Sequence, residues 1–267
     1  MKLSISNIAW DQADNEFVYG LMKGLGFTGL EIAPTKVMGE KPYERLDEAA
    51  EWASCHRTRY GFEVSSMQSV LYGVGLNVFD ASQSGCLLEY LKGAVRFASA
   101  VGCGNIVFGC PANRKVPSSV SSAEARSIAV DFFRDLGEYA SEKDVVIALE
   151  PVNEIYGTNF LNTTAETVDF IEYVASEGLK LNLDVGSMIQ SGEGLSVLSG
   201  HEKLINHVHI SEPGLEAVKE RDFHKELIFL LEESGYEGYV SVEMKKPKDI
   251  REVERVIKYI AGVAKRD

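Results

Sequence analysis

Short runs of aliphatic and β-branched residues recur along the chain, and each is followed by a longer stretch with the periodicity of an amphipathic helix. We expect eight strands, in the sequences KLSIS, TGLEI, FEVSSMQ, NIVFG, VVIALE, LKLNLD, NHVHIS and YVSVEM. The helical stretches that follow them are residues 14–25, 43–59, 85–101, 122–142, 164–177, a short 194–204, 222–234 and 248–264. Such alternation predicts parallel strands joined by crossover helices.

Eight strand–helix units in 267 residues are the size expected of one α/β domain, a (β/α)₈ TIM barrel over residues 1–267. A doubly wound open sheet is the rival fold, because Gly24, Gly26 and Gly29 have the G-x-G-x-x-G spacing of a dinucleotide site. That fingerprint follows a strand and opens a helix, whereas these glycines close a helix and open a strand. They are therefore interpreted as helix-ending and turn residues, which favours the barrel.

The last four strands each have an aliphatic face and a more polar face, because alternate side chains of a strand point to opposite sides. The aliphatic face should pack beneath the helices, so the other face points into the barrel. Each strand then carries one inward polar residue near its C-terminal end, and these are Glu150, Asp184, His209 and Glu243. Barrel enzymes build their active sites at that end of the strands.

These four residues predict a metal site. Three carboxylates with no opposing Lys or Arg on their strands would repel one another in a low-dielectric mouth, and a divalent cation removes the repulsion. Carboxylates with one imidazole suit Mn²⁺, Mg²⁺, Co²⁺ or Zn²⁺. Each residue alone could be salt-bridged or packed in the core, but four in register favour one bound cation. His207 lies one layer below His209 by parity, so a supporting role suits it better than coordination.

The segments ALEPVN, LNLDVGSM, HVHISEP and VSVEM, with NIAW and GFTGLEI, resemble the sugar isomerase/epimerase group of xylose-isomerase-like barrels. That group includes ketose 3-epimerases, hydroxypyruvate isomerases and inosose dehydratases, and the resemblance spans nearly the whole chain. It implies that Glu150, Asp184, His209 and Glu243 hold the metal. It also implies that Glu150 and Glu243 are catalytic, transferring a proton on opposite sides of the sugar through a metal-stabilised cis-enediolate.

The resemblance therefore implies a divalent-metal-dependent isomerase or epimerase of a sugar or sugar phosphate. An inosose-type dehydratase with the same metal site is the near alternative, because both reactions form an enolate. A DNA-repair endonuclease on a related barrel would use more histidines at its metals than a chain with five can place there. A non-catalytic sugar-binding barrel would tolerate the loss of one glutamate, and both are present.

Three positions depart from the pattern of the ketose 3-epimerases. Ser187 stands where a His usually follows the strand-6 Asp, and Tyr156 stands where a Glu is usual. The sequence SEPG replaces an Arg that commonly follows the strand-7 His. Because these positions grip the substrate in the relatives, the resemblance supports the metal core and leaves the sugar unspecified.

Several other residues near strand ends are candidates for substrate binding, namely Trp10, Gln68, Arg114, Glu212 and Lys245. Trp10 could stack on a sugar ring, Gln68 could bond a hydroxyl, and Lys245 could meet a substrate anion. The competing interpretation is plain packing for Trp10 and a solvated loop position for Arg114. Glu31 is interpreted equally as a residue of the active site or as one half of a salt bridge. His224 is interpreted as part of a helix start.

The composition argues against several partners and locations. A net charge of −13 opposes nucleic-acid binding. No apolar run approaches the length of a membrane span, and MKLSISNIAW is too short and polar for a signal peptide, so we expect a cytoplasmic protein without a membrane partner. The cysteines, expected to be buried free thiols, are Cys55, Cys86, Cys103 and Cys110. A homo-oligomer is an open alternative, because an apolar helix face at a dimer interface has the same sequence pattern as one that packs on the core.

Overall fold

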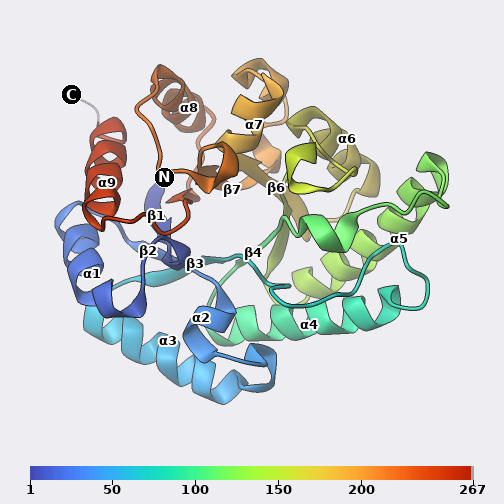
Figure 1. The fold of residues 1–267 in the computed structure, drawn as a ribbon, viewed down its shortest axis with the longest axis horizontal. Helices are drawn as coiled ribbons and strands as arrows, with labels where there is room; N and C mark the ends of the chain where they lie inside the picture. Colours follow the sequence, from blue (N-terminus) through green and yellow to red (C-terminus); the bar gives the residue numbers. More distant parts are fainter. Residues whose placement is uncertain (266–267) are drawn as a thin grey trace.

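The computed structural model describes residues 1–265 and shows a closed barrel of eight parallel strands inside a layer of helices (Figure 1). The strands are β1 (Lys2–Ser6), β2 (Gly29–Ile32), β3 (Glu63–Met67), β4 (Asn105–Phe108), β5 (Val146–Leu149), β6 (Leu179–Asp184), β7 (Ile205–Ile210) and β8 (Tyr239–Val242). They pair in sequence order, and β8 pairs back onto β1, with Ser4 opposite Ser241. The predicted (β/α)₈ barrel is confirmed.

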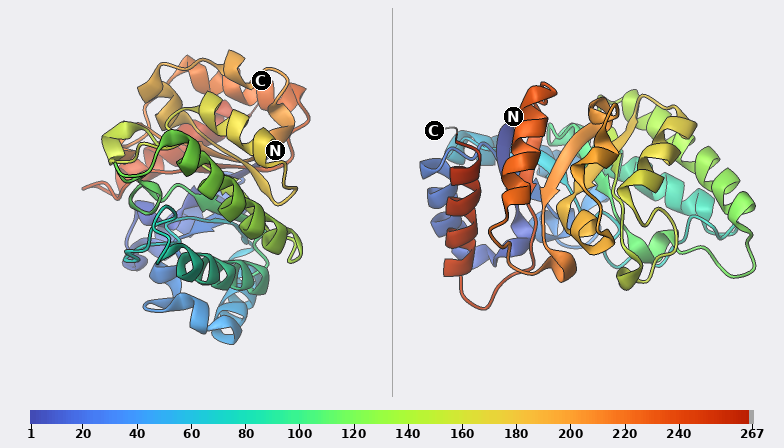
Figure 2. Two further views of the ribbon diagram at one scale, coloured as in Figure 1. Left: turned by 90° about the vertical axis from the view of Figure 1, so that its right-hand side faces the viewer. Right: turned by 90° about the horizontal axis from the view of Figure 1, so that it is seen from above.

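The helices are α1 (Asn15–Gly24), α2 (Pro34–Met38), α3 (Leu46–Tyr60), α4 (Ser84–Ala100), α5 (Ser122–Ser141), α6 (Thr164–Val174), α7 (Val185–Ser191), α8 (Asp222–Glu233) and α9 (Arg251–Val263). Figure 2 shows from two sides how they enclose the strands, with α9 beside α1. Their inward faces have the expected period: α9 buries Val253, Val256, Ile257 and Ile260, which lie on one side of a helix.

The helical segments after β2 and β6 differ from the sequence-based expectation. The short helix predicted over 194–204 contains only the 3₁₀ turns Leu195–Leu198 and Glu202–Leu204. The regular helix is α7, which begins directly after β6 because the Asp184 carboxylate caps it by accepting from the Ser187 N–H. The α2 helix was also not predicted, and it begins with Pro34, a residue suited to a first helical turn.

The glycines with dinucleotide-like spacing are turn residues, as expected. Gly24 ends α1, and Gly26 has a φ of 82°, a left-handed conformation that favours glycine. Gly29 begins β2, where an added Cβ would lie 2.5 Å from the ring of Tyr239. These glycines therefore serve the α1–β2 connection.

The cysteines are not all buried. Cys103 is buried and Cys110 is half-buried, but Cys55 and Cys86 are exposed, so the expectation was wrong for these two. They occupy outward positions of α3 and α4, next to the buried residues His56 and Leu87 that mark the inward faces. Among residues 1–265, no helix has both the length and the apolar character that a membrane span requires.

Candidate metal centre

The four predicted metal ligands come together at the C-terminal mouth of the barrel. Asp184 ends β6 opposite His209 on β7, while Glu150 and Glu243 directly follow β5 and β8. One ligand atom from each residue can be chosen so that all four lie within 4.8 Å of one another. The four side chains selected by strand parity therefore lie together in the structure.

The His209 ring is oriented by a buried carboxylate behind it. Its Nε2 lies 2.9 Å from Glu31 Oε2, and the same oxygen lies 2.8 Å from His207 Nε2. The Nδ1 atom of His209 faces the other way, 2.9 Å from Glu150 Oε1 and 3.3 Å from Glu243 Oε2. A proton on Nε2 directed at Glu31 leaves the Nδ1 lone pair available to a cation, an arrangement typical of histidines that bind metals.

Hydrogen bonds from neighbouring residues also hold the carboxylates of the site. Asn182 Nδ2 donates to Glu150 Oε1 at 2.7 Å. Asp184 accepts from the Ser187 N–H at 2.6 Å and from Ser211 Oγ at 2.5 Å. The sequence-based interpretation missed Asn182 and Ser211. Each lies two residues from a predicted ligand, Asn182 before Asp184 and Ser211 after His209, so strand parity points both side chains into the barrel.

The electrostatics of the cluster fit a divalent cation. Burial and the charge of Glu150 raise the pKa of Asp184 to about 6. Burial, with neighbouring carboxylates, also raises the pKa values of Glu150 and Glu243. Burial opposes a charge on His209, but Glu31 and Glu243 raise its pKa well above the usual value. The cluster holds more negative charge than its own residues neutralise, and oxygen and imidazole donors are ligands that divalent cations accept.

Glu150 and Glu243 are the two members of the cluster that line a cavity. Both line a cavity of about 510 Å³, and their side chains are 14% and 11% exposed, whereas His209 is fully buried. Gly109 makes room for Glu150, because a Cβ added there would lie 2.2 Å from Glu150 Oε2. Gln68 lines the same cavity and donates to Ser6 Oγ at 2.9 Å.

The remaining substrate-binding candidates do not line this cavity. Trp10 is almost fully buried, and its Nε1 donates to Asn15 Oδ1 at 2.8 Å. Both carboxylate oxygens of Glu212 accept from Arg221, at 2.7 and 2.6 Å. Lys245 is exposed and ion-paired with Glu216.

Two further residues are buried: Arg114 against the sequence-based interpretation, and His224 in the first turn of α8, as that interpretation expected. Arg114 is fully buried, so its interpretation as a solvated loop residue was wrong. Its positive charge lowers the raised pKa of Glu150, and its Nη2 donates to Leu161 O at 3.4 Å. His224 is also fully buried, with Nδ1 2.9 Å from the Tyr259 hydroxyl, so it joins α8 to α9.

Two of the departures from the epimerase pattern contact each other. The Tyr156 hydroxyl accepts a hydrogen bond from the Gly214 N–H at 2.6 Å. Gly214 belongs to the SEPG segment after β7, and Tyr156 belongs to the loop after β5. Burial and the charges of Asp184, Glu243 and Glu150 raise the pKa of Tyr156.

Comparison with known proteins agrees with this geometry. The family model for the xylose isomerase-like TIM barrel matches residues 20–261. The L-ribulose 3-epimerase of Methylomonas sp. (strain DH-1) is 36% identical over 94 residues, which span 34% of this chain and only 32% of that protein. The solved D-psicose 3-epimerase of Clostridium cellulolyticum H10 has a TM-score of 0.80 and 18% identity, covering 100% of both chains. The 3-keto-D-glucoside 4-epimerase of E. coli has a TM-score of 0.76 and 22% identity, covering 98% of both. The chain belongs to the xylose isomerase-like TIM barrel family.

Proposed function

We propose that the protein is a divalent-metal-dependent isomerase or epimerase that acts on a sugar. The observation that carries this proposal is the placement of Glu150 and Glu243. They belong to the metal-ligand cluster, both line the 510 Å³ cavity, and they reach it from β5 and β8, strands that are not neighbours. Two carboxylates on different sides of one cavity suit the removal and return of a proton.

The cation would be held by Glu150, Asp184, Glu243 and the Nδ1 atom of His209. When bound, it would polarise the substrate carbonyl and so make the neighbouring C–H more acidic. Glu31 keeps the His209 ring in place through Nε2, and Ser211 keeps Asp184 in place through its hydroxyl. Mn²⁺, Mg²⁺, Co²⁺ and Zn²⁺ all accept this donor set.

The two glutamates would divide the proton transfer between them. One carboxylate removes the proton next to the carbonyl, and the other returns a proton from its own side of the sugar. Return to the opposite face of the same carbon is epimerisation, and return to the neighbouring carbon is isomerisation. Asn182 orients Glu150 for either outcome, and Gln68 is the side chain on the cavity wall best suited to bond a sugar hydroxyl.

The relatives support this reaction class. The similar proteins described above carry the names of sugar epimerases, and the donor set found here can serve such chemistry. The Tyr156–Gly214 contact distinguishes the mouth of this protein, so we do not carry over the sugar of any one relative.

The proposal is tested by product analysis. Purified protein loaded with Mn²⁺ is incubated with D-fructose, D-psicose, D-tagatose and L-ribulose, and the sugars are separated by chromatography. We expect conversion of at least one ketose to its epimer or aldose isomer, and loss of that conversion with EDTA. A product that has lost water would assign the site to a dehydratase instead. No conversion, together with no metal binding, would remove the basis for the proposal.

A further inference from the structure

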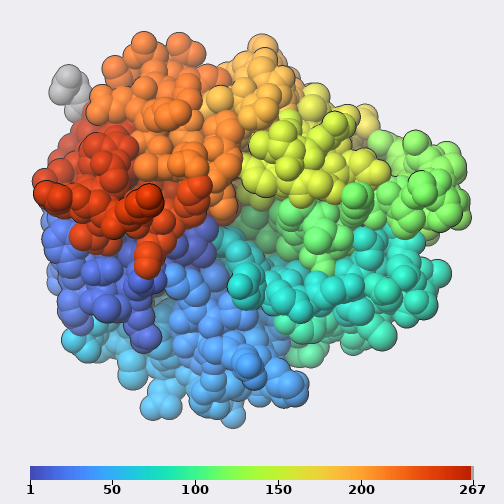
Figure 3. All heavy atoms as spheres, in the orientation of Figure 1, coloured from blue at the N-terminus to red at the C-terminus, as the bar shows by residue number. Residues whose placement is uncertain are grey.

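A second cavity, larger than the one at the metal ligands, opens beside it. It has a volume of about 1060 Å³ and lies between α2, the segments after α2 and β3, and the middle of α4. Figure 3 shows the blue segment after β2 and the cyan segment after β3 on the same face of the molecule. We call this space, which includes Tyr43, Tyr72 and Tyr90 in its wall, the tyrosine chamber.

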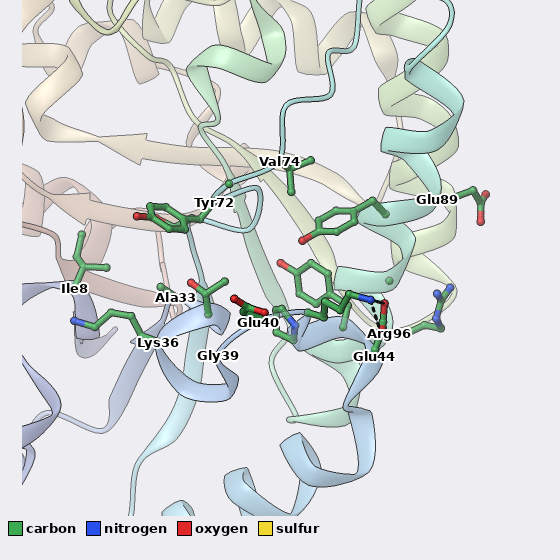
Figure 4. Close-up of a pocket in the computed structure, with 18 residues that line it drawn as sticks. Ile8, Ala33, Lys36, Gly39, Glu40, Glu44, Tyr72, Val74, Glu89 and Arg96 are labelled. Carbon is green, nitrogen blue, oxygen red and sulfur yellow. Dashed lines mark hydrogen bonds and ion pairs between the residues drawn. The ribbon is translucent and has the colours of Figure 1, made fainter.

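The tyrosine chamber and the cavity at Glu150 and Glu243 adjoin each other. Ile8, Ser69, Tyr72, Gly73 and Val74 line both spaces. Figure 4 shows Tyr72 between Ile8 and Val74, with Glu40 and Arg96 farther along the chamber. Tyr72 therefore lies where a ligand held at the metal cluster would meet the chamber.

The charges of both spaces suit an uncharged ligand. The described residues that line the 510 Å³ cavity include no Lys or Arg, so none of them could bind a phosphate as a cation. The chamber wall has three acidic and three basic side chains, Glu40, Glu44, Glu89, Lys36, Lys41 and Arg96. Each basic group has a partner within the protein: Lys41 pairs with Glu44 at 3.2 Å, and Lys36 donates to Trp10 O at 2.6 Å. Arg96 donates to the Tyr139 hydroxyl at 3.2 Å.

The aromatic residues of the chamber suit a sugar ring. Tyr72 is 76% exposed, and its hydroxyl has no hydrogen-bond partner within residues 1–265. Tyr90 packs edge-to-face on Tyr43 with ring centroids 5.1 Å apart. A phenol ring combines an apolar face with a polar edge, and a sugar likewise combines a C–H face with hydroxyls. A solvent-exposed tyrosine in the wall of both cavities offers its ring for stacking against the C–H face of a sugar.

We propose that the substrate is an uncharged glycoside of at least two sugar residues. Its ketose residue lies between Glu150 and Glu243, and the next sugar residue rests on Tyr72 in the tyrosine chamber. This inference rests on the proposed function for the reacting residue. It adds a second binding subsite and excludes sugar phosphates as the preferred substrates.

The first test compares substrates. The Mn²⁺-loaded protein is assayed in D₂O with D-fructose and with three disaccharides whose fructose residue is free at carbons 1 to 3, namely maltulose, lactulose and isomaltulose. We expect kcat/KM for deuterium incorporation to be at least tenfold higher for one disaccharide than for fructose. The Tyr72→Ala variant should lower that disaccharide-to-fructose ratio about tenfold. The control Tyr173→Ala, at a tyrosine of α6 that is 61% exposed, should leave the ratio unchanged. A ratio of one or below for all three disaccharides overturns the proposal.

The second test separates this inference from the proposed function. Saturation-transfer NMR is run with maltulose on the Glu243→Gln variant in excess Mg²⁺, a diamagnetic ion that leaves the sugar signals sharp. The measurement reports binding and does not require turnover. We expect saturation of protons in both sugar rings, and loss of the glucosyl signals when Tyr72→Ala is added. Saturation confined to the fructose ring overturns the subsite even if ketoses are converted. Saturated glucosyl protons with no conversion of any ketose by the wild-type protein would support the subsite and overturn the proposed reaction.

Discussion

Glu31 Oε2 lies 2.9 Å from His209 Nε2, and this buried contact determines which ring nitrogen faces the carboxylates of the candidate metal centre. The same oxygen lies 2.8 Å from His207 Nε2, so one carboxylate orients two histidines whose rings are nearly perpendicular. We predict that Glu31→Gln weakens Mn²⁺ binding about 10- to 100-fold, because an amide no longer selects the Nε2-protonated form of His209. Isothermal titration with Mn²⁺ measures the change.

The control for that variant is Glu172→Gln. Glu172 also contacts a histidine, His201, at 2.7 Å, but the pair lies on the surface away from the four ligands. Its replacement should leave Mn²⁺ affinity within twofold of the wild type. An unchanged affinity in Glu31→Gln would mean that the buried carboxylate does not orient the ligand.

Ser211 connects two of the strands that carry ligands. Its hydroxyl donates to Asp184 Oδ2 and accepts from the Gly186 N–H at 2.8 Å. We predict that Ser211→Ala costs about 1–3 kcal/mol of unfolding free energy, because it leaves buried polar groups without a partner. Urea denaturation measures this loss. Ser234→Ala, at an exposed serine whose hydroxyl donates to Leu231 O, should cost less. Equal losses in the two variants would contradict the assigned role.

Gly109 leaves no space for a side chain beside Glu150. An added Cβ would lie 2.2 Å from Glu150 Oε2, so we predict that Gly109→Ala displaces this carboxylate and lowers Mn²⁺ affinity at least about tenfold. Gly104→Ala is the matched control before the same strand, where the nearest atom to an added Cβ is Asp144 O at 3.6 Å. Titration of both variants should show the loss only for Gly109→Ala. Comparable Mn²⁺ affinities in the two variants would show that the Glu150 carboxylate can move without weakening Mn²⁺ binding.

Stability should depend on pH differently with and without a cation. The folded protein raises the pKa of Asp184 to about 6 from 3.8, chiefly through burial. In the metal-free protein, the stabilisation from protonated Asp184 is therefore present below about pH 4 and lost as the pH rises towards 6. A cation binds the ionised carboxylate, so its stabilising effect grows over the same range.

Thermal unfolding with and without MnCl₂ tests this dependence. We predict a larger rise in Tm on adding Mn²⁺ at about pH 7.5 than at about pH 5. Asp184→Asn should make the rise small at both values, since the variant lacks the titrating ligand. A rise in Tm that is equal at the two pH values in the wild type would contradict the role of Asp184.

The barrel and its inward polar residues could be predicted from the sequence because both follow local periodicities. The alternation of strands and helices set the fold, and the two-residue period of β5 to β8 identified Glu150, Asp184, His209 and Glu243. The Asp184 cap on α7 could not be anticipated from hydrophobic periodicity, because a single side-chain bond to the Ser187 N–H starts that helix. The boundaries after β6 were therefore wrong.

Residues that act across the barrel were harder to predict. Glu31 on β2 meets His209 on β7, and only the closed arrangement of strands brings them together. Arg114 follows β4 in a polar loop segment, which suggested solvent exposure. Its guanidinium is instead buried, and its charge lowers the pKa of Glu150. Pairings over such sequence separations depend on the tertiary fold and leave no periodic signal.

The proton-transfer role of Glu150 and Glu243 is tested most directly by solvent exchange. The Mn²⁺-loaded protein is incubated in D₂O with a ketose that it converts, and deuterium next to the carbonyl carbon is measured by NMR. We predict incorporation that is abolished by EDTA and lowered about 10²- to 10⁴-fold in Glu150→Gln and in Glu243→Gln. Undiminished exchange in the double variant Glu150→Gln/Glu243→Gln would contradict the assignment of these two carboxylates as the acid–base pair.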